Sequence, residues 1–206
     1  MKFPARGLYA ITQSEGKSPS KILAEVEAAL KGGAAVVQYR DKHRQDAAAY
    51  RLATDLTALC HAFQVPLVIN DSVDLALAAG ADGVHLGKED GELHEARRRL
   101  PPGAIIGVSC YNDLQKAEQA ARAGADYVAF GRFFPSGSKP LATKAEVETL
   151  RLAKQRLSLP IVAIGGILPD NAGQLLQAGA DVLAVIGGLF DYAPEQAARD
   201  YCALFT

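Results

Sequence analysis

The sequence predicts a single-domain (β/α)8 TIM barrel of parallel strands over residues 1–206. The first observation is length, because 206 residues fit one domain at the short end for such a barrel. The second is a series of eight short apolar runs separated by stretches with helical spacing. The third is a Gly-Ala-Asp repeat before every second run. An open flavodoxin-like sheet would use about five or six strands, so this alternation favours a closed barrel.

The apolar runs have the length and composition of buried strands. β-Branched and aromatic residues are frequent in them, and apolar and polar residues do not alternate cleanly. This is typical of parallel strands that are covered on both faces. In chain order, we expect strands at 8–12, 36–40, 65–70, 83–87, 105–110, 127–131, 160–166 and 182–188.

The stretches between these runs are rich in alanine and leucine and carry helix signals. An apolar stripe over 22–30 predicts the first helix, which Ser18 and the following proline would begin and Gly32 would end. Asparagine and aspartate pairs at 112–113 and 170–171 predict two further helix starts. Each helix then leads into the next strand, as a (β/α)8 barrel requires.

The Gly-Ala-Asp repeat marks the turns from helix to strand. It begins at Gly80, Gly124 and Gly179, before the fourth, sixth and eighth expected strands, and Gly33 begins a weaker copy before the second. Glycine ends a helix because it adopts a left-handed conformation at little cost. The repeat therefore supports a closed barrel rather than an open sheet.

Composition sets limits on partners and location. The net charge is −1, with 49% hydrophobic and 22% charged residues, so no global field favours nucleic acid or a membrane surface. The start lacks the apolar run of a signal peptide, and no segment reaches membrane-spanning length. Cys60, Cys110 and Cys202 are scattered, and we expect them to be reduced. We therefore expect a cytoplasmic protein with small-molecule partners, and a homo-oligomer is left open.

Polar residues follow most of the expected strands, where the active site of such a barrel forms. Asp71 and Asp90 come after neighbouring strands, within reach of one shared metal. Carboxylates without histidine or thiolate beside them favour Mg²⁺, which proteins hold with one or two carboxylates plus substrate phosphates. Each aspartate taken alone would more often cap a helix, but their joint position favours a metal site.

The same strand ends carry groups that bind phosphate. Arg40 and Lys42 follow the second strand, and Lys139 follows a loop of small residues after the sixth. Arginine can fork two donors onto phosphate oxygens, whereas lysine acts as a point charge. Glycine pairs at 165–166 and 187–188 end the seventh and eighth strands, at the usual phosphate site of these barrels. Glycine pairs also suit any tight turn, but both positions together favour phosphate.

Other polar residues are weaker candidates. His85 lies inside the fourth strand and is expected to be a packed, hydrogen-bonded residue rather than a base. The strand ends bring together no Ser-His-Asp or Cys-His set, which disfavours nucleophilic catalysis.

At these positions the sequence resembles the thiamine-phosphate synthase family. The resemblance runs from Leu8 to Gly188, and INDSVDLALAAGADGVHLGKED at 69–90 is its long and highly specific stretch. Shorter matches are VQYRDK at 37–42, IGVS at 106–109, PSGSK at 135–139 and AIGGI at 163–167. The resemblance implies that an aminopyrimidine diphosphate is joined to a thiazole phosphate, which gives thiamine phosphate and diphosphate.

The resemblance also implies roles for individual residues. Those implied for the pyrimidine diphosphate are Gln38, Tyr39, Arg40, Asp41, Lys42, Asn70, Ser109 and Lys139, of which Arg40, Lys42, Ser109 and Lys139 are implied to be catalytic. Those implied for the thiazole phosphate are Ser136, Gly137, Ser138, Gly166, Ile186 and Gly187. Asp71 and Asp90 are implied to bind one Mg²⁺ per subunit. Diphosphate would leave a pyrimidine-methyl cation, which the thiazole nitrogen attacks without a protein nucleophile.

Two departures from the family pattern concern the thiazole phosphate. Ser136 and Ser138 stand where the family usually has threonines, which keeps the hydroxyls and loses methyl packing. Gly187 stands where the family often has serine, and we expect a backbone N–H to hold the phosphate there.

Two rival functions remain open from the sequence. A thiazole tautomerase would be an isomerase that needs no metal, but the Asn70-Asp71 pair, Asp90 and Lys139 disfavour it. A non-catalytic barrel that binds a phosphate ligand would keep the glycine turns without needing Asp71, Asp90 and Lys139 together.

Overall fold

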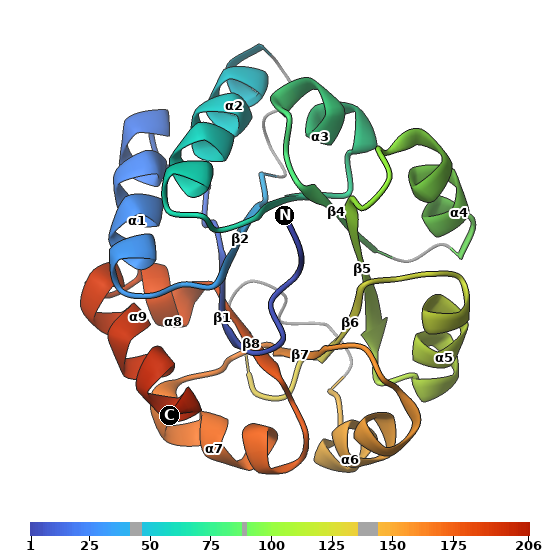
Figure 1. The fold of residues 1–206 in the computed structure, drawn as a ribbon. Helices are drawn as coiled ribbons and strands as arrows, with labels where there is room; N and C mark the ends of the chain where they lie inside the picture. Colours follow the sequence, from blue (N-terminus) through green and yellow to red (C-terminus); the bar gives the residue numbers. More distant parts are fainter. Residues whose placement is uncertain (42–46, 88–89, 136–143) are drawn as a thin grey trace.

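The predicted closed barrel is confirmed by a computed structural model, which describes residues 1–41, 47–87, 90–135 and 144–206. Its eight strands are all parallel and pair in chain order, and β1 pairs with β8 to close the sheet. Figure 1 shows the helices as a ring around the strands. The barrel therefore has a C-terminal end, here called the mouth, and an N-terminal end, here called the floor.

The strands are short and regularly spaced along the chain. They are β1 (Gly7–Ile11), β2 (Val36–Tyr39), β3 (Leu67–Asn70), β4 (Gly83–Leu86), β5 (Ile105–Tyr111), β6 (Tyr127–Gly131), β7 (Ile161–Ile164) and β8 (Val182–Val185). The helices are α1 (Pro19–Lys31), α2 (Ala47–Ala62), α3 (Val73–Ala79), α4 (Asp90–Arg99), α5 (Leu114–Arg122), α6 (Val147–Arg156), α7 (Pro169–Gln177), α8 (Gly187–Phe190) and α9 (Pro194–Cys202), followed by the 3-10 turn η1 (Ala203–Phe205).

All eight strands lie where the sequence predicts them, and only their ends differ. The seventh and eighth strands end before the glycine pairs, so both pairs belong to the turns at the mouth. Helix α1 begins as predicted, since the Ser18 hydroxyl accepts a hydrogen bond from the Lys21 N–H at 3.2 Å. Helix α7 begins at Pro169, one residue before the predicted start, because proline suits the first helical turn.

Two apolar layers hold the barrel together. The inner layer fills the barrel and includes Tyr9, Val36, Ile105, Tyr127 and Val162. The outer layer lies between the strands and the helices and is larger. It includes Leu8, Val37, Leu56, Ile106, Leu150 and Leu175. Neighbouring strand residues face opposite layers, because side chains alternate across a strand. Both faces of each strand are thus buried, which explains the continuous apolar runs.

The Gly-Ala-Asp repeat builds the floor. Gly80, Gly124 and Gly179 all have positive φ, as predicted for helix ends. The aspartate that follows accepts a hydrogen bond from a backbone N–H of the preceding strand: Asp82 from Leu67 at 2.9 Å, Asp126 from Ile106 at 2.8 Å and Asp181 from Ile161 at 3.0 Å. Each aspartate therefore ties two neighbouring strands together.

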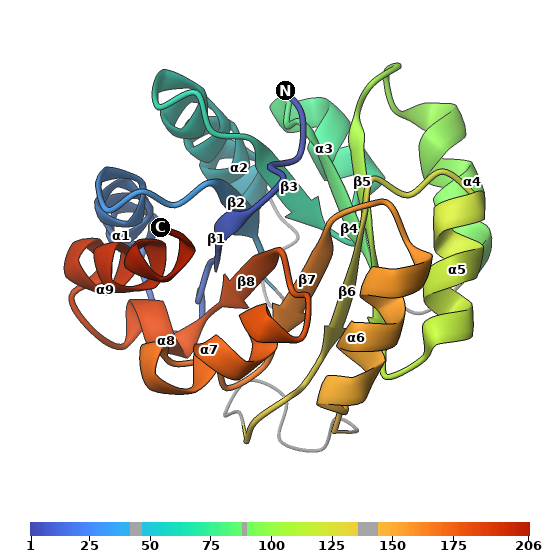
Figure 2. The same cartoon turned by 60° about the horizontal axis from the view of Figure 1, so that its bottom comes forward.

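The amino-terminal segment closes the floor. In Figure 2 this segment lies at the end of the barrel opposite the arrowheads of the strands. Phe3 stacks on the ring of Tyr127, with 3.8 Å between the ring centroids and 13° between the planes. Gly107 leaves room for this ring, because a Cβ atom there would come within 1.9 Å of Tyr127 Cζ. The inside of the barrel is thereby shielded from solvent at the floor.

No helix among the described residues is both long enough and apolar enough to cross a membrane.

Candidate functional site

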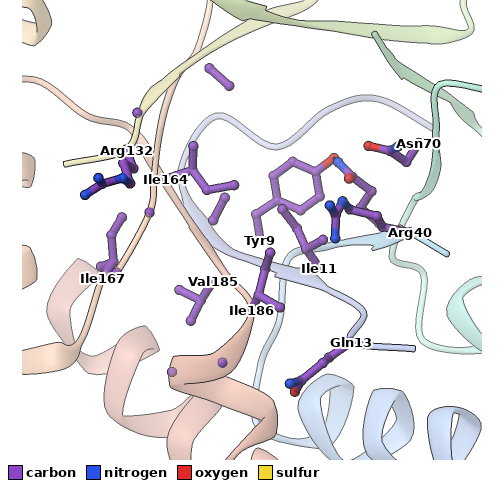
Figure 3. Close-up of a pocket in the computed structure, with 18 of the residues that line it drawn as sticks. Tyr9, Ile11, Gln13, Arg40, Asn70, Arg132, Ile164, Ile167, Val185 and Ile186 are labelled. Atoms are coloured by element: carbon purple, nitrogen blue, oxygen red, sulfur yellow. The ribbon is translucent and has the colours of Figure 1, made fainter. Parts of the chain in front are cut away.

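One large cavity of about 820 Å³ opens at the mouth of the barrel. Side chains or backbone from all eight strands contribute to its wall, among them Tyr9, Gln38, Asn70, His85 and Ser109. Figure 3 shows Arg40 beside Asn70 on one side of the cavity and Arg132 beside Ile164 on the opposite side, with Tyr9 between them. A cavity of this size is large enough for two small substrates.

Most of the site residues predicted from the sequence lie on this cavity. Those that line it are Gln38, Arg40, Asp41, Asn70, Asp71, Ser109, Gly166, Ile186 and Gly187. Tyr39 differs, because its side chain is buried in the outer apolar layer, and the residue does not line the cavity. Lys42, Ser136, Gly137, Ser138 and Lys139 lie outside the described residues, and Asp90 begins α4 with a side chain that is not described.

Arg40 is held in place through its backbone. Thr12 Oγ1 accepts from the Arg40 N–H at 2.9 Å, and the hydroxyls of Thr12 and Ser14 donate to the Arg40 carbonyl at 3.2 and 3.0 Å. Burial lowers the pKa of the Arg40 guanidinium, and the nearby negative charge of Asp71 opposes this change. The side chain remains a cation because arginine ionises far above neutral pH. Arg40 thus presents a fixed positive charge to the cavity.

Asp71 stands at the end of β3 in an unusual backbone conformation. Its φ of 62° is left-handed, which aspartate tolerates better than most residues. The Asp71 N–H donates to the His85 carbonyl at 2.9 Å, and Asn70 Nδ2 donates to Asp71 Oδ2 at 2.6 Å. Neighbouring strand β4 therefore fixes the backbone while the exposed carboxylate faces the cavity.

A continuous chain of hydrogen bonds crosses the inside of the barrel beneath the cavity, and we call it the interior chain. Gln38 Nε2 donates to Tyr9 Oη at 2.8 Å, and the hydroxyls of Tyr9 and Tyr127 are 2.8 Å apart. His85 Nδ1 lies 2.9 Å from Tyr127 Oη, and His85 Nε2 lies 2.9 Å from Ser109 Oγ. Burial raises the pKa of both tyrosines, so both stay protonated. His85 is hydrogen-bonded and packed, as the sequence predicts.

The glycine turns after β7 and β8 leave little space for side chains. A Cβ atom on Gly166 would come within 2.2 Å of the Pro135 carbonyl oxygen, and its φ of 64° also favours glycine. At Gly187, where serine is frequent in the family pattern, a Cβ atom would lie 2.6 Å from Asp191 Oδ2. The Asp191 carboxylate therefore stands beside the space that a serine side chain would use.

Arg132 is a cavity residue that the sequence analysis missed. It follows β6, and its Nη1 lies 3.5 Å from the Phe134 carbonyl oxygen. A Cβ atom on Gly165 would meet Arg132 Cβ at 2.3 Å, so the arginine stem packs against the glycine turn after β7. The signal that could have found it is its position one residue beyond the sixth strand, before the PSGSK loop.

The charged groups on the described part of the cavity wall are mostly negative. Among the lining residues that the structure describes, four are carboxylates, Glu15, Asp41, Asp71 and Asp191, and two are arginines, Arg40 and Arg132. No group of three or more histidine, cysteine, aspartate or glutamate side chains forms a metal site within the described parts of the chain. A magnesium ion held by one or two carboxylates and substrate oxygens needs no such group.

Comparisons with known proteins give consistent results over almost the whole chain. The family model described as thiamine monophosphate synthase matches residues 8–189. A thiamine-phosphate synthase of Thiobacillus denitrificans is 52% identical over 206 residues, which cover 99% of this chain and 96% of that protein. One of Nitrosococcus oceani is 51% identical over 190 residues, or 92% and 88% of the two chains. The solved thiamine phosphate pyrophosphorylase from Pyrococcus furiosus is 34% identical, with a TM-score of 0.87 and coverage of 97% and 95%.

Proposed function

This chain belongs to the thiamine monophosphate synthase family, whose members form thiamine phosphate with release of diphosphate, and we propose how its cavity carries out that transfer. The observation that carries the proposal is that one cavity of about 820 Å³ has an arginine on each of two opposite sides. Two phosphorylated substrates can then meet in one space with their charged groups apart. In this proposal, residues 1–206 form one catalytic domain.

The pyrimidine diphosphate is proposed to bind on the side of strands β2 to β5. Gln38, the backbone of Tyr39, Arg40, Asp41, Asn70 and Ser109 would contact it there, together with Lys42 and Lys139 from outside the described residues. Arg40 can give two parallel hydrogen bonds to diphosphate oxygens. Ser109 and Gln38 lie deeper in the cavity, at the two ends of the interior chain, where the uncharged ring would lie.

Asp71 and Asp90 are proposed to hold one Mg²⁺ per subunit. The Asp71 carboxylate faces the cavity, and a wall with four described carboxylates and two arginines needs further positive charge to accept a diphosphate. Hard oxygen donors without sulfur or imidazole suit magnesium. When it is bound, the ion would neutralise charge on the diphosphate.

The thiazole phosphate is proposed to bind at the glycine turns after β7 and β8. Backbone N–H groups of Gly166, Ile186 and Gly187 would contact it, with Ser136, Gly137 and Ser138 from outside the described residues. Arg132, whose stem packs against Gly165, would supply the positive charge on this side. This cation is a residue that the family resemblance alone does not assign.

The proposed reaction needs positioning and charge stabilisation rather than a protein nucleophile. Arg40, Lys42 and Lys139 would stabilise the departing diphosphate, and Ser109 would orient the pyrimidine so that its amino group supports the methyl cation. Once the C–O bond to diphosphate has broken, the thiazole nitrogen forms the new C–N bond to this cation. The closed floor beneath Tyr127 keeps water from reaching the cation from below.

The test is to mix both substrates with the protein and Mg²⁺ and to measure thiamine phosphate and diphosphate. We expect the two products in equal amounts, with loss of turnover when a chelator removes the metal. Isomerisation of a thiazole carboxylate without metal would support the tautomerase instead. Tight binding of thiazole phosphate with no product from either assay would support a binding barrel.

A cytoplasmic location is part of the proposal. Cys60, Cys110 and Cys202 are all free thiols, two of them buried, which suits a reducing compartment.

A further inference from the structure

We infer that Tyr9, Tyr127 and His85 act as positioning residues that fix the direction in which Ser109 presents its hydroxyl hydrogen to the cavity. The inference deepens the proposed function and rests on it, because its consequence concerns recognition of the aminopyrimidine. It follows from counting the donors and acceptors along the interior chain, from Gln38 at one end to Ser109 at the other.

The direction of the chain is set at the Gln38 end. Gln38 Nε2 is an amide nitrogen, which donates hydrogen bonds and does not accept them. Tyr9 Oη accepts this bond at 2.8 Å, and a phenol has only one hydrogen to give. That hydrogen is therefore directed to Tyr127 Oη, 2.8 Å away.

Tyr127 and His85 continue the same direction of donation. Tyr127 accepts from Tyr9, so its own hydrogen points to His85 Nδ1 at 2.9 Å. An imidazole nitrogen that accepts carries no hydrogen, so the neutral ring has its hydrogen on Nε2. His85 Nε2 then donates to Ser109 Oγ at 2.9 Å. The Ser109 hydroxyl oxygen accepts this bond from His85, so its own hydrogen can be donated to a ligand in the cavity.

The surroundings of the chain keep this direction from changing. Tyr9 and Tyr127 are almost fully buried, and burial raises the pKa of both, so neither loses its proton near neutral pH. Phe3 stacks on Tyr127 from the floor and limits access of water to the middle of the chain. Without water or ionisation, reversing one bond would leave two hydrogens or two lone pairs facing each other.

The two ends of the chain consequently offer opposite groups. Ser109 can donate its hydroxyl hydrogen to a ligand in the cavity. Gln38 donates an N–H to Tyr9, and its side-chain carbonyl oxygen can accept a hydrogen bond from a ligand. A 4-aminopyrimidine carries an N–H donor on its amino group next to an accepting ring nitrogen. A 4-oxopyrimidine exchanges the two, with an accepting oxygen next to a ring N–H. With the ring held in one orientation by its diphosphate, Ser109 would donate to the accepting ring nitrogen, which in the oxo compound carries a hydrogen. The interior chain therefore selects the amino compound against the oxo compound.

The first measurement is the tautomer of His85 in the wild-type protein, read from long-range ¹H–¹⁵N NMR with labelled histidine. The signal is assigned by its loss in His85→Gln. We expect the hydrogen on Nε2, and a hydrogen on Nδ1 would overturn the inference whether or not the protein turns over. Because this readout needs no substrate, it fails independently of the proposed function, which the product assay tests.

The second measurement compares two buried tyrosines that lose their hydroxyls. Tyr127→Phe cuts the interior chain but keeps the ring that stacks on Phe3. Tyr201→Phe removes a hydroxyl that donates to the Ile167 carbonyl at 2.8 Å, on the side of the glycine turns. We expect Tyr127→Phe to lower kcat/KM for the pyrimidine diphosphate by about tenfold, with KM for thiazole phosphate little changed.

The 4-oxopyrimidine diphosphate is the probe of specificity in the same pair of variants. Tyr127→Phe should reduce the preference for the amino substrate over the oxo substrate and should populate both tautomers of His85. Tyr201→Phe should leave the preference and the tautomer as they are. Equal preference for the amino substrate in wild type and Tyr127→Phe would overturn the inference, as would equal losses in both variants.

Discussion

At the floor of the barrel one arrangement occurs three times, whereas at the mouth the strand ends differ from one another. Asp82, Asp126 and Asp181 each accept a hydrogen bond from the backbone of a neighbouring strand. Each also pairs with a basic side chain from a helix: His61 at 2.9 Å, Arg97 at 2.7 Å and Lys154 at 2.5 Å respectively. At the mouth, the corresponding positions carry Arg40, Asp71, Ser109 and the glycine turns, each with different partners.

The contrast separates stability from chemistry. At the floor, a helix ends directly before every second strand, and that strand must pair with its neighbour. The same Gly-Ala-Asp sequence ends the helix and ties the two strands together in three of these places. At the mouth each strand end faces a different part of two substrates. Positive φ at residues other than glycine occurs at both ends: Asp71 and Tyr111 lie at strand ends of the mouth, and Gln64 lies between α2 and β3 at the floor.

The largest effect should come from Asp71→Asn at the mouth. Asparagine tolerates the left-handed backbone, so the fold should be kept while the charge proposed to hold Mg²⁺ is lost. We expect kcat/KM to fall by roughly a hundredfold to a thousandfold, with Tm little changed. Steady-state kinetics and thermal unfolding check both parts.

The control is Asp74→Asn, which removes an exposed carboxylate on α3 beyond the cavity. It should leave turnover close to wild type. A similar loss of turnover in both variants would refute a specific role for Asp71.

The next effect should come from Asp126→Ala at the floor. The variant leaves the buried Ile106 N–H without its acceptor and removes the carboxylate partner of Arg97, which keeps its hydrogen bonds to the Ala104 and Gly124 carbonyls. We expect the free energy of unfolding to fall by about 2 kcal/mol, with kcat/KM nearly unchanged. Denaturant unfolding and kinetics on the same sample measure the two quantities.

Asp126→Asn separates the two contacts of this aspartate. Asparagine keeps an oxygen for the Ile106 N–H and loses the exposed ion pair, so it should cost less than about 1 kcal/mol. If the alanine variant instead lost turnover at unchanged stability, the division between floor and mouth would be wrong.

A smaller effect should divide the mouth itself into two sides. Arg132→Met keeps the side-chain stem against Gly165 and removes its charge. We expect KM for thiazole phosphate to rise by about tenfold while KM for the pyrimidine diphosphate stays the same. Arg156→Met, an exposed arginine on α6, is the matched control. A rise in the other KM would place Arg132 with the diphosphate.

The smallest effect concerns the acid stability of the floor. Burial alone would raise the pKa of the Asp82 carboxyl. Hydrogen bonds from the Leu67 N–H, the amino terminus and His61 outweigh burial, so the pKa is lowered. A carboxylate with a lowered pKa in the folded state stabilises above its unfolded value and loses this contribution as pH falls through the folded value. Asp82→Asn should therefore be less stable than wild type near neutral pH, and the difference should shrink below about pH 4.

Denaturant unfolding at a series of pH values measures this difference. Asp55→Asn, an exposed carboxylate on α2, serves as the control and should show no such convergence. A difference between wild type and Asp82→Asn that does not depend on pH would contradict the assignment.

Much of the mouth was predictable because strand ends can be counted along the chain. Arg40, Asp71, Ser109 and Gly166 were expected at one cavity and lie on it. Tyr39 was grouped with them through its segment, but strand alternation turns its side chain into the outer layer. Arg132 also follows a strand and could have been counted in the same way, but its packing against the turn after β7 is visible only in the structure.

The sequence by itself determined the barrel, the Gly-Ala-Asp repeat of the floor and most of the polar groups predicted at the mouth, because these depend on local periodicity and on residues close together in the chain. Only the tertiary structure decided the interior chain, since Tyr9, Gln38, His85, Ser109 and Tyr127 come from five different strands. Each looks like an ordinary strand residue alone. Hydrogen bonds are directional and short-ranged, so their pattern exists only once barrel closure brings these side chains within 3 Å of one another.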